Sequence, residues 1–140
     1  GVNVIEAIAG LEPQPLDYIN IPRATYCHPQ VASFGLTEEQ AREQGIECKI
    51  GRFPFQASGK ALAIGETEGK IKLILGSEHG ELLGAHLVGP DVTELLAEIS
   101  MTHLLEGTAS ELGLMIHSHP TLSETLKEAA LDANGEAIHV

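Results

Sequence analysis

The residues best suited to chemistry lie near the C-terminus, between positions 117 and 124, where the sequence reads HSHPTLSE. His119 carries an imidazole, which can take up and release a proton near neutral pH, and Glu124 carries a carboxylate. A carboxylate that accepts a hydrogen bond from one ring nitrogen fixes the tautomer and leaves the other nitrogen to face a substrate. The pattern therefore indicates a general base with an orienting carboxylate.

Pro120 determines the local backbone of this stretch. A proline disfavours helical angles in the residue before it, so we expect His119 in extended backbone just outside a helix. Thr121 is a good N-cap residue, and Glu124 three residues later completes a capping-box pattern. The positive end of this helix would disfavour an imidazolium at His119, whereas the Glu124 carboxylate would favour it.

Glu124 also has a purely structural interpretation, as the reciprocal partner of the cap. The same spacing of a capping residue and Glu or Gln occurs elsewhere in the chain, at Thr37–Gln40, Asp91–Glu94 and Thr108–Glu111. Spacing alone therefore leaves the catalytic and the structural interpretation of Glu124 both open.

Strands and helices must position these residues. The pattern of strands and helices expected from the sequence predicts an α+β fold, with a mainly antiparallel β-sheet covered by helices. Alternating residues over 71–75 and 81–88, joined by a turn, predict a β-hairpin in which Gly84 leaves room for close packing. Further strands are expected within 24–36 and over 46–53, further helices over 1–10, 37–44, 91–106 and 110–115, and a loop over 56–68.

Two of the expected helices have informative faces. After Thr121, apolar residues recur at helical spacing, at Leu122, Leu126, Ala129, Ala130 and Ala133, while Lys127, Glu128 and Asp132 fall on the other face. The helix capped by Asp91 has one stripe made of Val92, Leu95, Leu96, Ile99 and His103, and further apolar residues, Met101, Leu104 and Leu105, partly off it. A helix that is apolar beyond one stripe needs burial on a second side, which indicates an oligomer.

Composition excludes several classes of partner. The 140 residues hold 8 basic and 20 acidic side chains, a formal net charge of −12, which argues against nucleic acid or an anionic membrane as the main partner. No apolar run reaches the length of a membrane span, and no targeting segment is visible, so we expect a cytoplasmic protein, or one of an organelle matrix. Since Gly1 is not a start residue, we expect a processed product or a piece of a longer chain.

The sequence gives less support for a metal site or a disulfide than for the His119–Glu124 pair. His117 and His119 lie two residues apart, but Pro120 interrupts a regular strand and no third ligand lies at a supporting spacing, so no metal site is expected. Cys27 and Cys48 form no CxxC pair, so two buried free thiols are expected, with a disulfide between them as the alternative. The other histidines are expected at the surface or hydrogen-bonded in the core.

The stretch from His119 to Glu124, ahead of an alanine-rich helix, resembles the C-terminal motif of the FAD-dependent pyridine nucleotide–disulfide oxidoreductases. Ile21-Pro22 and residues 26–37 (YCHPQVASFGLT) are similar to the segment that opens the dimerisation domain of this family, and residues 84–89 (GAHLVG) to its central strand. The form of this motif with Leu122 at its fourth position most resembles the motif of the dihydrolipoyl dehydrogenases. The glutathione reductases are close relatives of these enzymes. Gln30 is a departure, because many relatives have an acid there.

The resemblance implies a division of the chain and a role for its site. Residues 1–16 would be the trailing helix and linker of a preceding flavin domain, and residues 17–140 the dimerisation (interface) domain. His119 would act as the base in the active site of the partner subunit, Glu124 would orient it, and His117 and Pro120 would lie near the flavin of that subunit.

The resemblance also implies cofactors and partners. The complete enzyme would use FAD and NAD, while this chain alone would bind neither, since it has no GxGxxG pattern and the redox cysteines of the family belong to another domain. The partners would be a second copy of the chain and dihydrolipoamide carried on an acyltransferase or a glycine cleavage carrier protein. The alternatives are another disulfide reductase, such as a glutathione reductase, and a stand-alone dimerisation module without chemistry.

Overall fold

A five-stranded sheet in the order β1-β2-β5-β4-β3 forms the centre of the fold in the computed structural model, which describes residues 1–139. The strands are β1 (Arg23–Thr25), β2 (Gln30–Gly35), β3 (Cys48–Pro54), β4 (Lys70–Gly76) and β5 (Leu82–Gly89). All neighbouring strands are antiparallel, and β4 and β5 form the predicted hairpin. The predicted α+β class is therefore confirmed.

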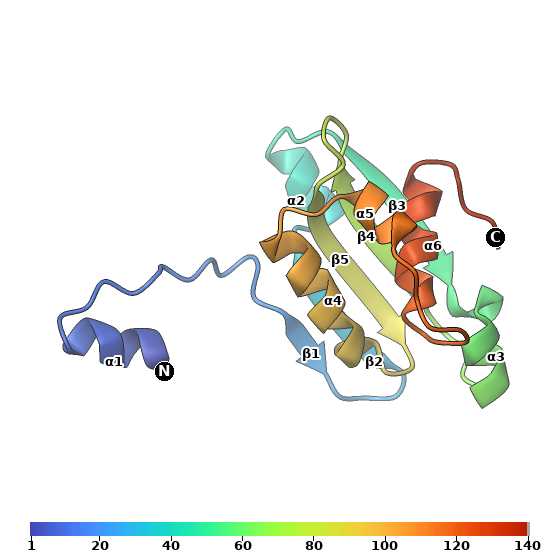
Figure 1. The fold of residues 1–140 in the computed structure, drawn as a ribbon, viewed down its shortest axis with the longest axis horizontal. Helices are drawn as coiled ribbons and strands as arrows, with labels where there is room; N and C mark the ends of the chain where they lie inside the picture. The colour runs from blue at the N-terminus through green and yellow to red at the C-terminus, as the bar shows by residue number, and fades with distance from the viewer. Residues whose placement is uncertain (140) are drawn as a thin grey trace.

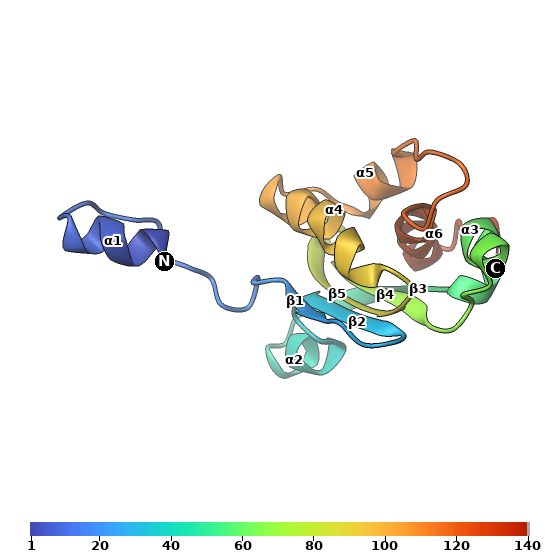
Figure 2. The ribbon, with the colours of Figure 1, turned by 90° about the horizontal axis from the view of Figure 1, so that it is seen from below.

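The helices cover the two faces of the sheet unequally. Three of them, α4 (Val92–Leu104), α5 (Ala109–Leu114) and α6 (Glu124–Ala133), lie on one face, and α2 (Glu38–Glu43) lies on the other (Figure 2). The short helix α1 (Val2–Ile8) lies apart from the sheet at the end of an extended segment and has no buried residue (Figure 1). Within residues 1–139, none of the helices combines the length and the apolar character that crossing a membrane requires.

The main core lies between the sheet and the three helices on its more covered face. On β4, Ile71, Leu73 and Leu75 alternate toward this face, and each is at most 1% exposed. They join Ile99 of α4 and Leu126 of α6 in one cluster. Because burial of a large aliphatic side chain contributes about 1.5–3 kcal/mol, the predicted alternation of β4 explains why α4 and α6 dock here.

Helix α6 lies unusually close to the edge strand β3. A Cβ atom at Gly51 would overlap the backbone carbonyl oxygen of Ala129, so only glycine permits this approach. At the same edge, the Arg52 N–H donates a hydrogen bond to Asp132 Oδ2 at 2.7 Å, which satisfies an otherwise free strand donor. Gly84 on β5 has the predicted close contact as well, since a Cβ there would overlap the Leu36 carbonyl.

Of the four predicted helix caps, two are confirmed, and those at Asp91 and Thr121 are wrong. Thr37 with Gln40, and Thr108 with Glu111, form reciprocal capping boxes at α2 and α5. Asp91 precedes α4 with a φ of 49° and makes no side-chain cap. Instead, Gln30 Oε1 accepts hydrogen bonds from the Thr93 N–H at 3.2 Å and from Thr93 Oγ1 at 2.8 Å.

The loop predicted over 56–68 is largely wrong, because most of this stretch is helical. A 3-10 turn at Phe55–Ala57 leads into α3 (Gly59–Ile64). Ser58 Oγ accepts the Ala61 N–H at 3.3 Å at the start of α3, and Gly65 ends the helix with a φ of 76°. The small residues conceal the helix, but Ser58 and Gly65 are the cap signals that could have revealed it.

Substitution of Gly51 tests the contact between α6 and β3. In a Gly51→Ala variant the new methyl group would push α6 away from the sheet, so we expect the free energy of unfolding to fall by about 1–3 kcal/mol in urea titrations. Gly59→Ala is the matched control, because a Cβ at Gly59 has nothing within 4 Å. It should be neutral, or stabilising by up to about 1 kcal/mol, and equal losses in both variants would contradict the close-packing argument.

Candidate active site

His119 and Glu124 form a direct hydrogen-bonded pair. His119 lies on the loop between α5 and α6, and Glu124 is the first residue of α6. His119 Nδ1 lies 2.9 Å from Glu124 Oε1, with side chains 79% and 32% exposed. The imidazole is therefore held at one nitrogen and presented to solvent at the other.

The backbone around Thr121 differs from the expected N-cap. The Thr121 hydroxyl donates to the Ser118 carbonyl at 2.8 Å and so does not cap α6. The helix begins at Glu124 with Ser123 as N-cap, and its first turn is closed by the Thr125 N–H, which donates to the Leu122 carbonyl at 3.1 Å. Only half of the predicted capping box forms, since Glu124 Oε2 accepts the Thr121 N–H at 2.8 Å.

The two interpretations of Glu124 left open by the sequence are therefore compatible. One oxygen of this carboxylate accepts from His119, and the other accepts from the backbone of Thr121. The structural bond fixes the carboxylate in the orientation in which its second oxygen meets the imidazole.

The charge of Glu124 determines the tautomer of His119. Burial raises the pKa of the Glu124 carboxyl, but the hydrogen bonds from the Thr121 N–H and from His119 outweigh burial and leave this pKa below its ordinary value. An ionised carboxylate can only accept hydrogen bonds, so Nδ1 of His119 carries the proton of the pair. Nε2 then keeps a lone pair, and this exposed nitrogen can act as a general base.

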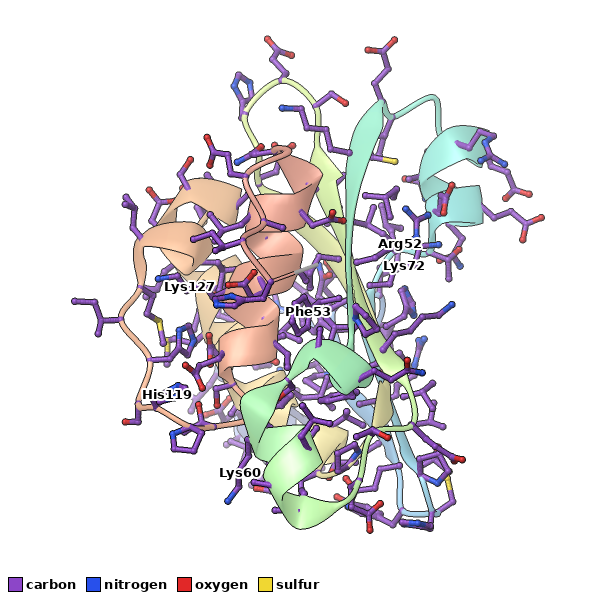
Figure 3. All side chains as sticks on the ribbon, turned by 90° about the vertical axis from the view of Figure 1, so that its right-hand side faces the viewer. Arg52, Phe53, Lys60, Lys72, His119 and Lys127 are labelled. Atoms are coloured by element: carbon purple, nitrogen blue, oxygen red, sulfur yellow. The ribbon has the colours of Figure 1, made fainter. Side chains whose placement is uncertain are left out.

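A cleft of about 500 Å³ opens beside the pair, between the loop, α3, α6 and the C-terminal segment. Figure 3 shows His119 on the loop at the side of α6, at the same end as α3. Apolar side chains form much of the wall, namely Phe53, Ala57, Leu62, Ile116 and Ile138. The proton acceptor of His119 therefore lies at the edge of a cleft with largely apolar walls.

The two residues expected near a flavin have different surroundings. The side chain of His117 is only 3% exposed, and its Nε2 lies 2.9 Å from Glu98 Oε1 on α4. Pro120 is exposed and follows His119 through a cis peptide bond. Contact of either residue with a flavin stays a prediction.

A third imidazole–carboxylate pair lies on the same cleft, and sequence reasoning missed it. Glu128 of α6 is buried, because the C-terminal segment folds back over it. Glu128 Oε1 lies 2.8 Å from His139 Nδ1, and its Oε2 accepts the N–H groups of Ile138 and His139. Glu128 and His139 are separated by 11 positions, so no short motif connects them.

The remaining histidines and cysteines have ordinary environments. His103 Nδ1 and His86 Nε2 each lie 3.0 Å from a backbone carbonyl, and both residues are half-buried rather than part of the core. Cys27 and Cys48 are both free, as predicted, but neither is buried, since Cys27 is exposed and Cys48 is half-buried. Among residues 1–139, no three His, Cys, Asp or Glu side chains are grouped as metal ligands.

Comparison with known proteins agrees with the family resemblance. The dimerisation domain of the pyridine nucleotide-disulphide oxidoreductases matches residues 21–130. Dihydrolipoyl dehydrogenases of Bacillus subtilis and Rhizobium etli are 46% and 51% identical to the chain, over 99% of its length in both cases. The chain spans 29% of the length of each of these two relatives.

Solved structures agree with the fold. The HOCl-induced flavoprotein disulfide reductase RclA of Escherichia coli superposes with a TM-score of 0.84 at 28% identity, covering 92% of this chain and 30% of RclA. LpdA of Mycobacterium tuberculosis gives a TM-score of 0.82 at 20% identity, covering 91% of this chain and 28% of LpdA, and at that identity supports the fold alone. The match over most of the chain shows that this protein belongs to the dimerisation-domain family of the pyridine nucleotide–disulphide oxidoreductases.

Proposed function

We propose that the chain is the C-terminal dimerisation domain of a dihydrolipoyl dehydrogenase and that it supplies the catalytic base to the active site of the partner subunit. The observation that carries the proposal is the His119–Glu124 pair, at 2.9 Å, with the second imidazole nitrogen facing outward. The names of relatives at 46% and 51% identity support this choice among the disulfide reductases.

The proposed division of the chain follows its packing. Residues 17–140 form the dimerisation domain, and residues 1–16 are the trailing helix and linker of a flavin domain. Helix α1 supports this division, because Val4, Ile5 and Ile8 are all exposed and need another surface for burial.

The base would act at the first proton transfer of the reaction. His119 Nε2 takes the proton from a thiol of dihydrolipoamide, and the resulting thiolate attacks a disulfide held by the rest of the enzyme, because the thiolate is the nucleophile in exchange. Glu124 keeps the acceptor nitrogen directed at the thiol and stabilises the imidazolium that forms. One sulfur of the enzyme disulfide leaves as a thiolate, and the other stays bound to the substrate in a mixed disulfide. The second substrate thiol gives its proton to the thiolate released first and attacks the substrate sulfur of the mixed disulfide, so that lipoamide closes and the second enzyme sulfur leaves as a thiolate.

The cofactors would be bound outside this chain. The sequence has no glycine-rich fingerprint for dinucleotide phosphates, so its residues do not fit a separate FAD or NAD site. In the complete enzyme, FAD would take the electrons from the cysteine pair and pass them to NAD. His117 and Pro120 would at most border the flavin of the partner.

An exposed apolar surface supports a homodimer. Met101, Leu104 and Leu105 at the end of α4 are exposed, as are Leu114 and Ile116 nearby in the chain. These residues include the apolar positions of α4 that lie off its buried stripe, and exposed apolar patches of this kind mark interaction surfaces. The dimer would act on dihydrolipoamide carried by an acyltransferase or a glycine cleavage carrier protein, and the two free cysteines favour the reducing cytoplasm.

Replacement of the base is the decisive test of the proposed function. In the complete enzyme, His119→Gln removes the proton acceptor, so we expect the rate of dihydrolipoamide oxidation by NAD to fall at least about a hundredfold. His79→Gln is the matched control, because His79 lies exposed on the β4–β5 turn. Unchanged turnover in the His119 variant would leave the domain as a dimerisation module without chemistry. Turnover of glutathione disulfide in place of dihydrolipoamide would reassign the substrate.

The pKa of Glu124 predicts a pH dependence of stability. Because this pKa is lowered in the folded state, the carboxylate stabilises the fold at pH values above its unfolded pKa and loses that contribution as pH falls through the folded pKa. Glu124→Gln should therefore lower the free energy of unfolding at pH 7 by about 1 kcal/mol. The difference from wild type should shrink in urea titrations as the pH falls through the folded pKa and vanish once the carboxyl is protonated, and a difference that stays constant would contradict the argument.

A charge in the apolar surface tests the dimer. Leu104→Lys would place an ammonium group in a dry contact, so we expect the dimer dissociation constant to rise at least about tenfold, as measured by analytical ultracentrifugation. Glu39→Lys on α2, on the other face of the sheet, is the control for an added lysine. A dimer that tolerates Leu104→Lys would place the subunit contact elsewhere on the domain.

A further inference from the structure

The loop that carries His119 is held by few contacts of its own backbone. From Ile116 to Pro120, within the described part of the chain, no residue takes part in a hydrogen bond between backbone groups. Side chains must therefore hold this loop. On the C-terminal side of His119, Glu124 and Thr121 do so.

On the N-terminal side, His117 is the corresponding anchor. Its side chain is nearly completely buried, and its Nε2 lies 2.9 Å from Oε1 of Glu98. Glu98 projects from α4, next to Ile99, whose side chain is fully buried against the sheet. The hydrogen bond thus ties the loop to a helix that the core holds in place.

The imidazole of His117 depends on this one partner. Its Nδ1 is buried and has no hydrogen-bond partner among residues 1–139. The bond to a carboxylate requires a proton on Nε2, which leaves Nδ1 as an acceptor without a donor. Without Glu98, both ring nitrogens would be buried without a hydrogen-bond partner. The cost of burying these unpaired atoms would favour a conformation in which the side chain leaves this site and reaches solvent.

On the basis of the proposed function, we infer that Glu98 and His117 are positioning residues for the catalytic base. His119 follows His117 by two residues, so the loop is fixed from α4 on one side and from α6 on the other. Loss of the α4 anchor would leave the His119–Glu124 bond in place but would let the loop shift. A shift of about 1 Å at a reacting group can reduce the rate a hundredfold.

The test compares variants of Glu98 in the complete enzyme. In Glu98→Ala the anchor is lost, and we expect kcat for dihydrolipoamide oxidation to fall about tenfold or more, with KM within about twofold, because the base acts in the transition state. In Glu98→Gln the side-chain oxygen still accepts from Nε2, and at least half of the turnover should remain. Glu94→Ala is the matched control, since Glu94 is exposed one turn earlier on α4, and its turnover should be unchanged.

Two further measurements separate positioning from general destabilisation. Ferricyanide reduction by NADH uses the flavin and needs no proton from a thiol, so it should be unchanged in Glu98→Ala. If that variant does not fold, His117→Gln replaces it in the comparison, because its amide nitrogen can donate to Glu98 where Nε2 did, whereas His117→Leu cannot. Retained turnover in His117→Gln and a tenfold loss in His117→Leu would support the inference.

Several outcomes would overturn it. Wild-type turnover in Glu98→Ala or His117→Leu would show that the anchor is not needed. Equal losses in Glu98→Ala and Glu98→Gln, or a parallel loss of ferricyanide reduction, would assign the pair to the stability of the fold. These results are distinct from failure of the proposed function, which would appear as unchanged turnover in His119→Gln.

Discussion

The close packing of α6 against the edge strand β3 is the constraint on which the site depends. Gly51 allows the helix backbone to approach the strand, and Asp132 binds the strand N–H of Arg52. Because an α-helix is stiff over three turns, fixing its C-terminal half also fixes its first residue, Glu124. A contact of the edge strand thus determines where the orienting carboxylate lies, although no residue of β3 belongs to the His119–Glu124 pair.

The carboxylate itself shows how one side chain can hold the backbone and orient an imidazole together. One oxygen of Glu124 accepts a hydrogen bond from the backbone of Thr121, and the other accepts one from His119. The first bond removes the rotational freedom that would otherwise have to be lost when the second one forms. Preorganisation of this kind is what a general base needs, since a proton acceptor must be directed before the substrate arrives.

The sequence was most informative where partners are close along the chain. His119 and Glu124 are five positions apart, and the capping boxes at Thr37 and Thr108 span three, so local spacing indicated these contacts. The same spacing also predicted caps at Asp91 and Thr121 that do not form. Contacts that depend on the tertiary fold were not predictable in this way. In place of the cap expected from Asp91, Gln30 accepts from Thr93, 63 positions away, and His117 meets Glu98 across 19 positions. Helix α3 was missed for a different reason, because its small residues carry no strong periodicity.

The outward orientation of His119 has a consequence for how such an enzyme responds to dilution. A subunit that offers its base to a neighbour gains nothing from that base when it is alone, even though its own fold is intact. Specific activity would then fall as dimers dissociate and recover as they reassociate, with no unfolding in between. Under the proposed function, this imidazole, 79% exposed in the single chain, would act only across the subunit contact, so subunit concentration would itself set the reaction rate.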